Sequence, residues 1–253
     1  MSMTQPLAGK AAIITGSARN MGRAFAEALA RLGANLTVHH HGPASQSDAE
    51  ETARLVQEQG GRAVVISGDL VELSTVKQLF DETITAFGRV DIVINNAGLV
   101  IKKPFGEITE EDFERSFGIN AKAAFFVMQE AARRIADNGR IINMGTTILG
   151  ATVPYYAVYA GAKAPLEDFT RALAREIGHR GVTVNVVAPG PIDDEFYHGA
   201  ETPEAVARAT QASVAGRLGH ISDIVPLIAF LASPESQWIT AQTLFINGGY
   251  LAR

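Results

Sequence analysis

The chain has 253 residues, of which 47% are hydrophobic and 19% are charged, with a formal net charge of −5 and no cysteine. This composition is that of a globular protein, and the length allows one large α/β domain or two small ones. The acidic balance argues against nucleic acid as a main partner, and the lack of cysteine excludes disulfides, thiolate catalysis and cysteine-based zinc sites.

The first ten residues carry no charged segment followed by an apolar run, so they do not resemble a signal peptide. No apolar run reaches the roughly 18 residues that a membrane-spanning helix needs. We therefore expect a cytoplasmic protein.

From residue 11 onward, short apolar runs alternate with segments of helical periodicity. Continuous apolar runs are typical of strands buried on both faces, and they predict strands at Ala11–Thr15, Asn35–His40, Ala63–Ser67, Val90–Asn95, Arg140–Met144, Val182–Val187 and Thr243–Ile246. Apolar residues three and four apart predict helices between them, among them Met21–Leu32, Thr52–Gln59, Ser74–Phe87 and Glu111–Ala136. Strand and helix in repeated alternation predict one α/β domain over 1–253, a doubly wound parallel sheet of about seven strands with helices on both faces.

One connection is unusually long. Residues 189–216 contain several acidic side chains, Gly199 and the Thr202–Pro203 pair. Long connections in compact domains are usually functional lids or disordered segments. We expect a lid over a substrate, with a solvated insertion as the alternative.

A glycine-bearing turn joins the first strand to the first helix, in the sequence Thr15-Gly16-Ser17-Ala18-Arg19-Asn20-Met21-Gly22. Glycines let the backbone approach a pyrophosphate, and the N–H groups of a helix N-terminus favour its negative charge. The turn therefore predicts a dinucleotide site.

The end of the second strand indicates which dinucleotide binds. A carboxylate there would bind the ribose hydroxyl of NAD, whereas a basic group would accept the 2′-phosphate of NADP. Histidines occupy positions 39–41, and the first acid beyond them is Asp48. The pattern favours NADP(H), with Arg19 as phosphate partner and His40 or His41 assisting, and leaves NAD(H) open. A metal site at the histidines is disfavoured, because neighbours on a strand point to opposite faces.

Two further motifs are more specific than a glycine-rich turn. The fourth strand ends in Asn95-Asn96-Ala97-Gly98, and Tyr159-Ala160-Gly161-Ala162-Lys163 follows later in the chain. Four other landmarks agree in order, namely Asp69-Leu70, Asn120, Pro189-Gly190 and Asn247-Gly248-Gly249.

Together these motifs resemble the short-chain dehydrogenase/reductase family, including its 3-oxoacyl-thioester reductases and its alcohol and sugar dehydrogenases. The resemblance extends from about Gly9 to Tyr250. It implies a Rossmann-type fold and NAD(P)-dependent interconversion of a carbonyl and a secondary alcohol.

Tyr159 and Lys163 support acid–base chemistry independently of the resemblance. Residues four apart lie on one face of a helix. A cation beside the phenol lowers its pKa from about 10 towards neutrality, where general acid–base catalysis is most effective. We predict that Tyr159 exchanges a proton with the substrate oxygen.

The resemblance implies two further catalytic residues. The family has a serine thirteen residues before the tyrosine, and that position is Thr146 here, which we prefer over Thr147. Threonine keeps the hydroxyl but adds a methyl group. Asn120 corresponds to an asparagine whose carbonyl holds a water in a proton relay through the lysine. Asn20 replaces the middle glycine of the turn, and asparagine adopts left-handed backbone geometry more readily than most residues.

The turn and the resemblance together assign the cofactor contacts. They are Gly16, Ser17, Arg19, Asn20, Met21, Gly22, His40, His41, Asp69, Leu70, Asn95, Ala97, Gly98, Tyr159, Lys163, Pro189, Gly190 and Ile192. By resemblance, Asp69 and Leu70 would hold the adenine, and the backbone of Ile192 the nicotinamide carboxamide.

The substrate is expected to contact a largely apolar group of side chains, which suits a hydrophobic or medium-sized carbonyl compound. The group consists of Ile148, Val153, Tyr156, Phe196 and Tyr197.

Members of the family are commonly tetramers that pair two long helices, here around 111–136 and 159–178, so a homotetramer is expected by analogy. An NAD-linked alcohol dehydrogenase is the alternative within the enzyme class. A non-catalytic NADP(H)-binding sensor is the alternative outside it, and it would predict loss of Tyr159 or Lys163, which are both present. A methyltransferase on a similar sheet would have no use for the tyrosine–lysine pair.

Overall fold

The computed structural model describes residues 5–151 and 153–252, so residues 1–4 and 253 of the predicted domain lie outside the described part, as does residue 152. Within that part, seven parallel strands form one sheet in the order β3-β2-β1-β4-β5-β6-β7. The strands are β1 (Ala11–Ile14), β2 (Asn35–His40), β3 (Ala63–Ser67), β4 (Ile92–Asn95), β5 (Arg140–Met144), β6 (Thr183–Pro189) and β7 (Thr243–Ile246). The predicted sheet is confirmed, with strand ends within two residues of the expected ones.

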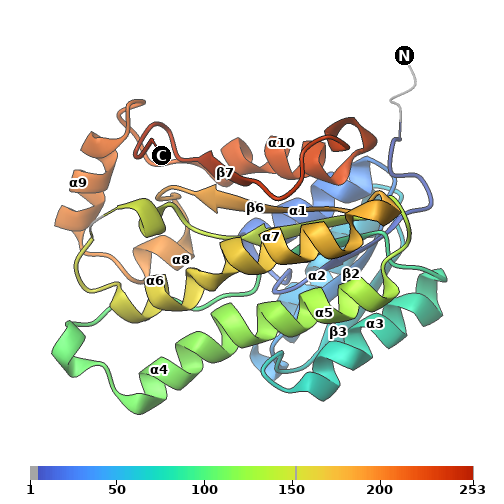
Figure 1. The fold of residues 1–253 in the computed structure, drawn as a ribbon, viewed down its shortest axis with the longest axis horizontal. Coiled ribbons are helices and arrows are strands. Elements are labelled where there is room, and N and C mark those ends of the chain that lie inside the picture. The colour runs from blue at the N-terminus through green and yellow to red at the C-terminus, as the bar shows by residue number, and fades with distance from the viewer. Residues whose placement is uncertain (1–4, 152, 253) are drawn as a thin grey trace.

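Helices cover both faces of the sheet (Figure 1). One layer contains α1 (Asn20–Arg31), α2 (Gln46–Glu58) and α10 (Ile221–Ala232). The other contains α3 (Leu73–Phe87), α4 (Glu110–Phe117), α5 (Ala124–Arg134), α6 (Ala157–Lys163) and α7 (Pro165–Ile177). The layers arise because successive strand residues point to opposite faces.

Strand β1 illustrates how the two cores form. Ile13 packs into the cluster that contains Phe80 of α3, whereas Ile14 packs into the cluster that contains Phe25 of α1. All four side chains are fully buried, and burying a side chain of this size contributes about 1.5–3 kcal/mol. The continuous apolar runs in the sequence therefore form strands that are buried on both faces of the sheet.

Two helices differ from their predicted bounds. Helix α2 begins at Gln46 rather than at the predicted Thr52. The apolar pattern misses its start, because the first turn is polar and the buried positions begin only at Ala49. The predicted helix 111–136 consists of α4, a π-helical segment η3 (Gly118–Ala123) and α5. Segment 189–216 holds the short helices α8 (Glu195–His198) and α9 (Pro203–Ala212).

The carboxyl ends of the strands set the place of the site. Strand β1 lies between β2 and β4, so the chain order reverses beside it. Ligands of open α/β sheets bind in the crevice at such a switch point. In the described part, no helix combines the length and apolarity needed to cross a bilayer.

Candidate active site

The turn after β1 has the geometry of an anion site. Gly16 adopts φ +63°, and a Cβ on Gly22 would lie 2.4 Å from the Gly16 carbonyl oxygen, so no side chain fits there. Asn20 adopts φ +50°, the left-handed geometry expected of it. Helix α1 begins without a side-chain cap, which leaves the N–H groups of its first turn for a ligand. These features fit the pyrophosphate of a dinucleotide.

Two residues that the sequence analysis missed hold this turn in place. His39 Nδ1 accepts a hydrogen bond from Gly16 N at 3.1 Å, and its Nε2 donates to Gly68 O at 2.9 Å. Burial lowers the pKa of His39 to about 4, so the ring is neutral near neutral pH. Asn96 Nδ2 donates to the carbonyls of Thr15 and Gly16, both at 3.0 Å.

The side chains of Asn95 and Leu70, two predicted cofactor contacts, point into the protein. Asn95 is buried and its Nδ2 donates to Asn143 Oδ1 at 2.7 Å, so its side chain points into the protein while that of Asn96 faces the turn. Strand alternation explains the difference between these neighbours. Leu70 is buried in the apolar cluster beneath α3, so its side chain packs rather than facing the cleft.

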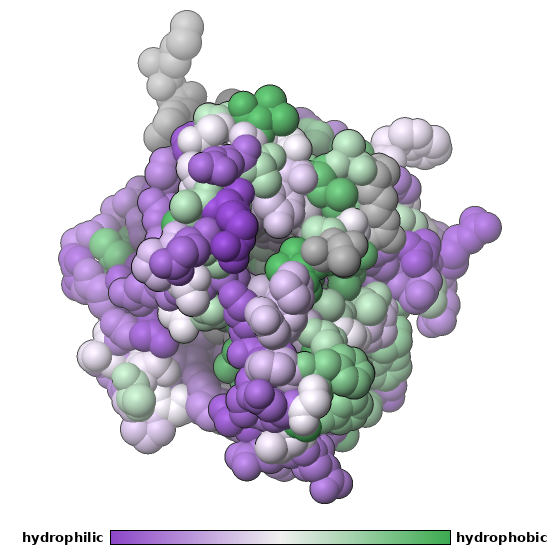
Figure 2. Space-filling view, turned by 90° about the vertical axis from the view of Figure 1, so that its left-hand side faces the viewer, coloured by the Kyte–Doolittle hydropathy of each residue, from purple (hydrophilic) through white to green (hydrophobic). Residues whose placement is uncertain are grey.

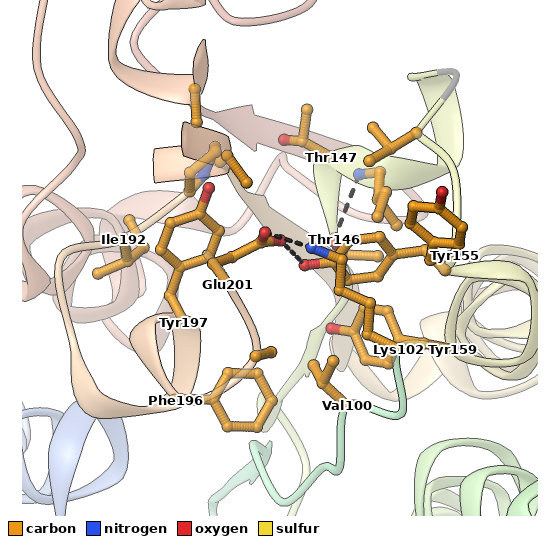
Figure 3. Close-up of a pocket in the computed structure, with 18 of the residues that line it drawn as sticks. Val100, Lys102, Thr146, Thr147, Tyr155, Tyr159, Ile192, Phe196, Tyr197 and Glu201 are labelled. Carbon is orange, nitrogen blue, oxygen red and sulfur yellow. Dashed lines mark hydrogen bonds and ion pairs between the residues drawn. The ribbon is translucent and has the colours of Figure 1, made fainter. Parts of the chain in front are cut away.

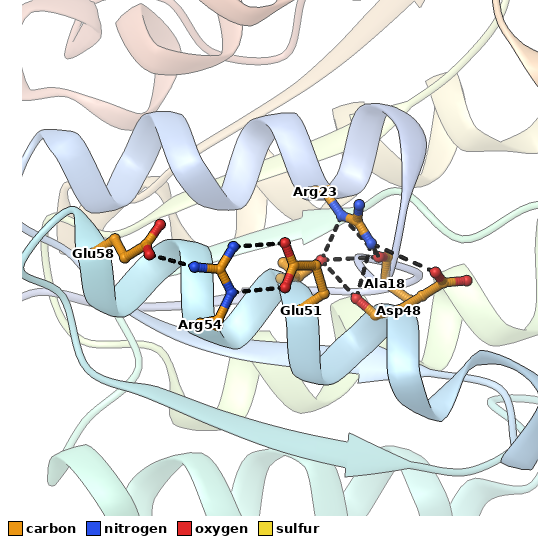
Figure 4. A network of polar contacts seen from close by, with 7 residues as sticks. Ala18, Arg23, Asp48, Glu51, Arg54 and Glu58 are labelled. Carbon is orange, nitrogen blue, oxygen red and sulfur yellow. Dashed lines mark hydrogen bonds and ion pairs between the residues drawn. The ribbon is translucent and has the colours of Figure 1, made fainter.

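A network around Arg23 joins the turn to α2 (Figure 4). Arg23 donates to the Ala18 carbonyl through Nη2 at 2.7 Å and Nε at 3.1 Å, and to the Asp48 carbonyl at 3.0 Å. Thr52 Oγ1 donates to the same Ala18 oxygen at 2.8 Å. The position of Arg19 therefore depends on α2.

The polar groups beyond β2 differ in exposure. Arg19 is exposed, and its side chain has no hydrogen bond or ion pair within the described residues. His40 is buried, with Nδ1 donating to Gly42 O at 3.0 Å and Nε2 unpartnered in that same part of the chain. His41 is exposed, 3.9 Å from Asp69. Among the residues described, no cluster of His, Cys, Asp or Glu could hold a metal ion.

The two hydroxyls of the predicted catalytic set meet at the carboxyl end of β5. Tyr159 on α6 is buried, and its phenol interacts with the Thr146 side chain. Burial raises the pKa of Tyr159 to about 12, and the contact with Thr146 opposes the shift. The expected lowering of this pKa is therefore wrong, because burial has the largest effect and raises it. Thr147 donates instead to Ala188 O at 3.1 Å.

Lys163 and Asn120 both lie beside Gly98. A Cβ on Gly98 would lie 3.4 Å from Lys163 Nζ and 2.9 Å from Asn120 Oδ1. Lys163 Nζ donates to Met144 O at 2.8 Å, and burial lowers the pKa of Lys163 to about 8. Asn120 lies in the π-helical segment η3 and its Oδ1 accepts from Leu99 N at 3.2 Å. π-Helical bulges are frequent at functional sites because they reposition one side chain.

A cavity of about 750 Å³ opens at this edge of the sheet, where the molecular surface is hollowed (Figures 2 and 3). The predicted cofactor residues Met21, Pro189, Gly190 and Ile192 line one side. All the predicted substrate residues line it too, namely Ile148, Val153, Tyr156, Phe196 and Tyr197.

The cavity is less apolar than expected. Glu201, from the segment between α8 and α9, receives hydrogen bonds from Lys102 Nζ and from the Tyr156 hydroxyl. Figure 3 shows the Glu201 side chain pointing from the 189–216 segment towards Lys102 on the opposite wall. No sequence pattern predicts this trio, because Lys102 and Glu201 are 99 residues apart.

A phosphate-binding turn at the switch point of a parallel sheet, with Tyr159, Thr146 and Lys163 in the adjoining cavity, defines the class of dinucleotide-dependent oxidoreductases. The adh_short_C2 family model, described as Enoyl-(Acyl carrier protein) reductase, matches residues 16–251. The chain belongs to the short-chain dehydrogenase/reductase family.

Three relatives align over almost their whole length. A short-chain type dehydrogenase/reductase of Picea abies is 38% identical, over 96% of this chain and 93% of its own. The hydroxynaphthalene reductase-like protein Arp2 of Metarhizium brunneum is 36% identical, over 96% and 95%. An NADPH-dependent aldehyde reductase-like chloroplastic protein of Arabidopsis thaliana is 38% identical, over 97% and 96%.

Two solved structures are similar throughout. A dehydrogenase from Burkholderia cenocepacia with bound NADP has a TM-score of 0.95 and 42% identity, over 100% of this chain and 97% of its own. Landomycin C-6 ketoreductase LanV with bound NADP and rabelomycin has a TM-score of 0.87 and 34% identity, over 97% and 98%. The family supports an oxidoreductase that interconverts a carbonyl and an alcohol.

Proposed function

We propose that the protein reduces the carbonyl group of a cyclic, aromatic-ring ketone with NADPH. The observation that carries this proposal is the meeting of two hydroxyls, Tyr159 and Thr146, at one end of the cavity. Two hydroxyls that converge on one point can both hydrogen-bond a single substrate oxygen.

Each residue has a role in this reaction. The turn from Gly16 to Gly22 would hold the pyrophosphate, and Arg19 the 2′-phosphate. NADPH supplies the hydride when it is bound. Thr146 orients the substrate oxygen, and the Tyr159 phenol donates a proton to it as negative charge develops. The Lys163 ammonium stabilises the phenolate that remains.

The proposed preference for NADP(H) is supported by residues of this chain and by the proteins that resemble it. Arg19 has an exposed, unpaired side chain among the described residues, and no carboxylate ends β2. One similar structure carries NADP, and one relative is named as NADPH-dependent.

The substrate class rests on the cavity walls. Tyr155, Phe196 and Tyr197 give it aromatic surfaces that suit a flat ring system. One relative is named as hydroxynaphthalene reductase-like and one similar structure as landomycin C-6 ketoreductase, and these names support the same class.

A direct assay separates the rival reactions. Purified protein is mixed with NADPH or NADH and with 1-tetralone or crotonyl-coenzyme A, and cofactor absorbance and products are followed. We expect 1-tetralone to be reduced to its alcohol, faster with NADPH. Reduction of the enoyl thioester alone would overturn the ketone proposal, and oxidation of 1-tetralol with NAD as the sole activity would favour the alternative dehydrogenase.

We also propose that the protein is a cytoplasmic homotetramer, with the lid formed by 189–216. Exposed Phe113 and Phe125 lie beside Phe117, Phe126 and Phe169 on the outer face of α4, α5 and α7. An aromatic face of this kind supports helix pairing between copies. The cysteine-free sequence fits a reducing compartment.

A further inference from the structure

The trio of Lys102, Glu201 and Tyr156 spans the cavity. The side chains of Lys102 and Glu201 are 17% and 5% exposed, so this is a nearly dry ion pair. Lys102 Nζ also lies 5.3 Å from the centroid of the Tyr156 ring. The three residues come from the segment after β4, the lid segment and the start of α6, so folding alone brings them together.

Stability does not explain the trio. Removing a carboxylate and an ammonium from water costs free energy that their attraction barely recovers. Apolar residues of similar size in their place often give a protein of equal or greater stability. Burial, and next Glu201, raise the pKa of the Tyr156 phenol, so Tyr156 keeps its proton and Glu201 is the acceptor. If these charged groups do not serve stability, their place in a ligand cavity indicates that they recognise a ligand.

The trio has hydrogen-bonding capacity left. A carboxylate offers about four acceptor positions, and Glu201 uses two on Lys102 and Tyr156. Lys102 has three N–H donors, of which one contacts Glu201. A hydroxyl group on a ligand can bond both residues, because it can donate to the Glu201 carboxylate and accept from the Lys102 ammonium.

The trio is also adjacent to the reacting end of the cavity. The rings of Tyr156 and Tyr159 are in edge contact with centroids 6.1 Å apart. A ring system whose carbonyl oxygen contacts Tyr159 therefore extends along Tyr156 towards Glu201.

We propose that Lys102, Glu201 and Tyr156 form a subsite for a hydroxyl group on the substrate, so that the preferred substrates are neutral hydroxylated ring ketones. The inference rests on the proposed ketone reduction and adds the recognition group. Carboxylated ketones are disfavoured, because Glu201 repels a second carboxylate while Lys102 is already paired.

The test compares 1-tetralone with its 5-, 6- and 7-hydroxy derivatives in the wild type and in Glu201→Gln and Lys102→Met. Glu204→Gln is the matched control, an exposed glutamate of the same lid segment outside the cavity lining. For the wild type we expect at least one hydroxy isomer to exceed 1-tetralone about 10- to 100-fold in kcat/KM, as for a hydrogen bond to a charged group. The two trio variants should remove this advantage and retain activity on 1-tetralone, and Glu204→Gln should keep it.

Binding provides a second readout that does not need turnover. The 1-tetralol alcohols and their hydroxy derivatives are titrated calorimetrically into each variant with NADP, and thermal unfolding checks that the variants fold. If no ketone is reduced, the proposed function fails, while a hydroxyl preference in binding that Glu201→Gln abolishes still supports the subsite. Equal loss for all compounds in the trio variants, or no hydroxyl preference in the wild type by either readout, would overturn the subsite.

Discussion

At the residue scale, burial is the main influence on the pKa values of the proposed catalytic pair, Tyr159 and Lys163. Lys163 and Tyr159 are both buried, and each moves towards its neutral form, with the pKa of Lys163 at about 8 and that of Tyr159 at about 12. The neutral phenol is the form that donates a proton, as the proposed reduction requires.

These values predict the pH dependence of ketone reduction. As pH rises through about 8, Lys163 loses its charge, whereas Tyr159 keeps its proton until about 12. The phenolate left after proton donation then lacks a stabilising cation. We expect kcat/KM with NADPH to be level below pH 8 and to fall about tenfold per unit above it, since this parameter reports groups of the free enzyme. A profile that stays level to pH 10 would contradict the role of Lys163.

Arg19 is the residue proposed to select the nucleotide. Replacing Arg19 with alanine removes the cation proposed to pair with the 2′-phosphate, so NADPH binding should weaken about tenfold while NADH binding changes little. Calorimetric titration of both nucleotides measures this. Arg31→Ala, at the other end of α1, is the control and should bind both as the wild type does. Equal weakening of both nucleotides in the Arg19 variant would refute the assignment.

Local spacing predicted some of these residues and could not predict others. Thr146 follows from its distance to Tyr159, and Asn20 from the known backbone preference of asparagine. The side-chain direction of Asn95 could not be predicted, because two adjacent asparagines are alike in sequence until the strand sets their faces. Glu201 and Lys102 carry no local pattern, since only the closed fold brings them into contact.

At the element scale, the phosphate-binding turn is braced by α2. Arg23 makes three hydrogen bonds to the carbonyls of Ala18 and Asp48. Arg23→Ala should lower the free energy of unfolding by about 1–3 kcal/mol, because these partly buried acceptors lose a charged donor. It should also weaken NADPH and NADH equally, because the pyrophosphate cradle is disturbed rather than the 2′-phosphate contact.

Denaturant unfolding and nucleotide titration measure both effects. Arg54→Ala is the matched control on α2 itself, since Arg54 forms only exposed ion pairs with Glu51 and Glu58, which contribute little. A larger loss of stability in the Arg54 variant than in the Arg23 variant would argue against the brace.

The strands were predictable because continuous apolar runs have one physical origin, burial on both faces. The first turn of α2 was not, because polar residues there carry no periodicity. The π-helical segment η3 inside the predicted helix was also invisible, since its extra residue per turn leaves the composition unchanged.

At the scale of the whole molecule, the outer face of α4, α5 and α7 governs assembly in our proposal. Phe113 is 50% exposed and stacks on Phe117 with centroids 4.2 Å apart. Phe113→Ser should convert the tetramer to smaller species in light scattering coupled to size-exclusion chromatography. Phe105→Ser, at an exposed phenylalanine outside this face, should remain tetrameric. A wild-type protein that elutes as a monomer would refute the proposal.

The central claim is that Tyr159 donates the proton as NADPH delivers hydride to a ketone. The most direct measurement follows deuterium from [4-²H]NADPH into the carbinol carbon of 1-tetralol, by mass spectrometry, for the wild type and Tyr159→Phe. We predict labelled alcohol from the wild type and a rate about a thousandfold lower in the variant, with NADPH binding retained. Labelling at the wild-type rate by Tyr159→Phe, or no label in wild-type product, would contradict the account.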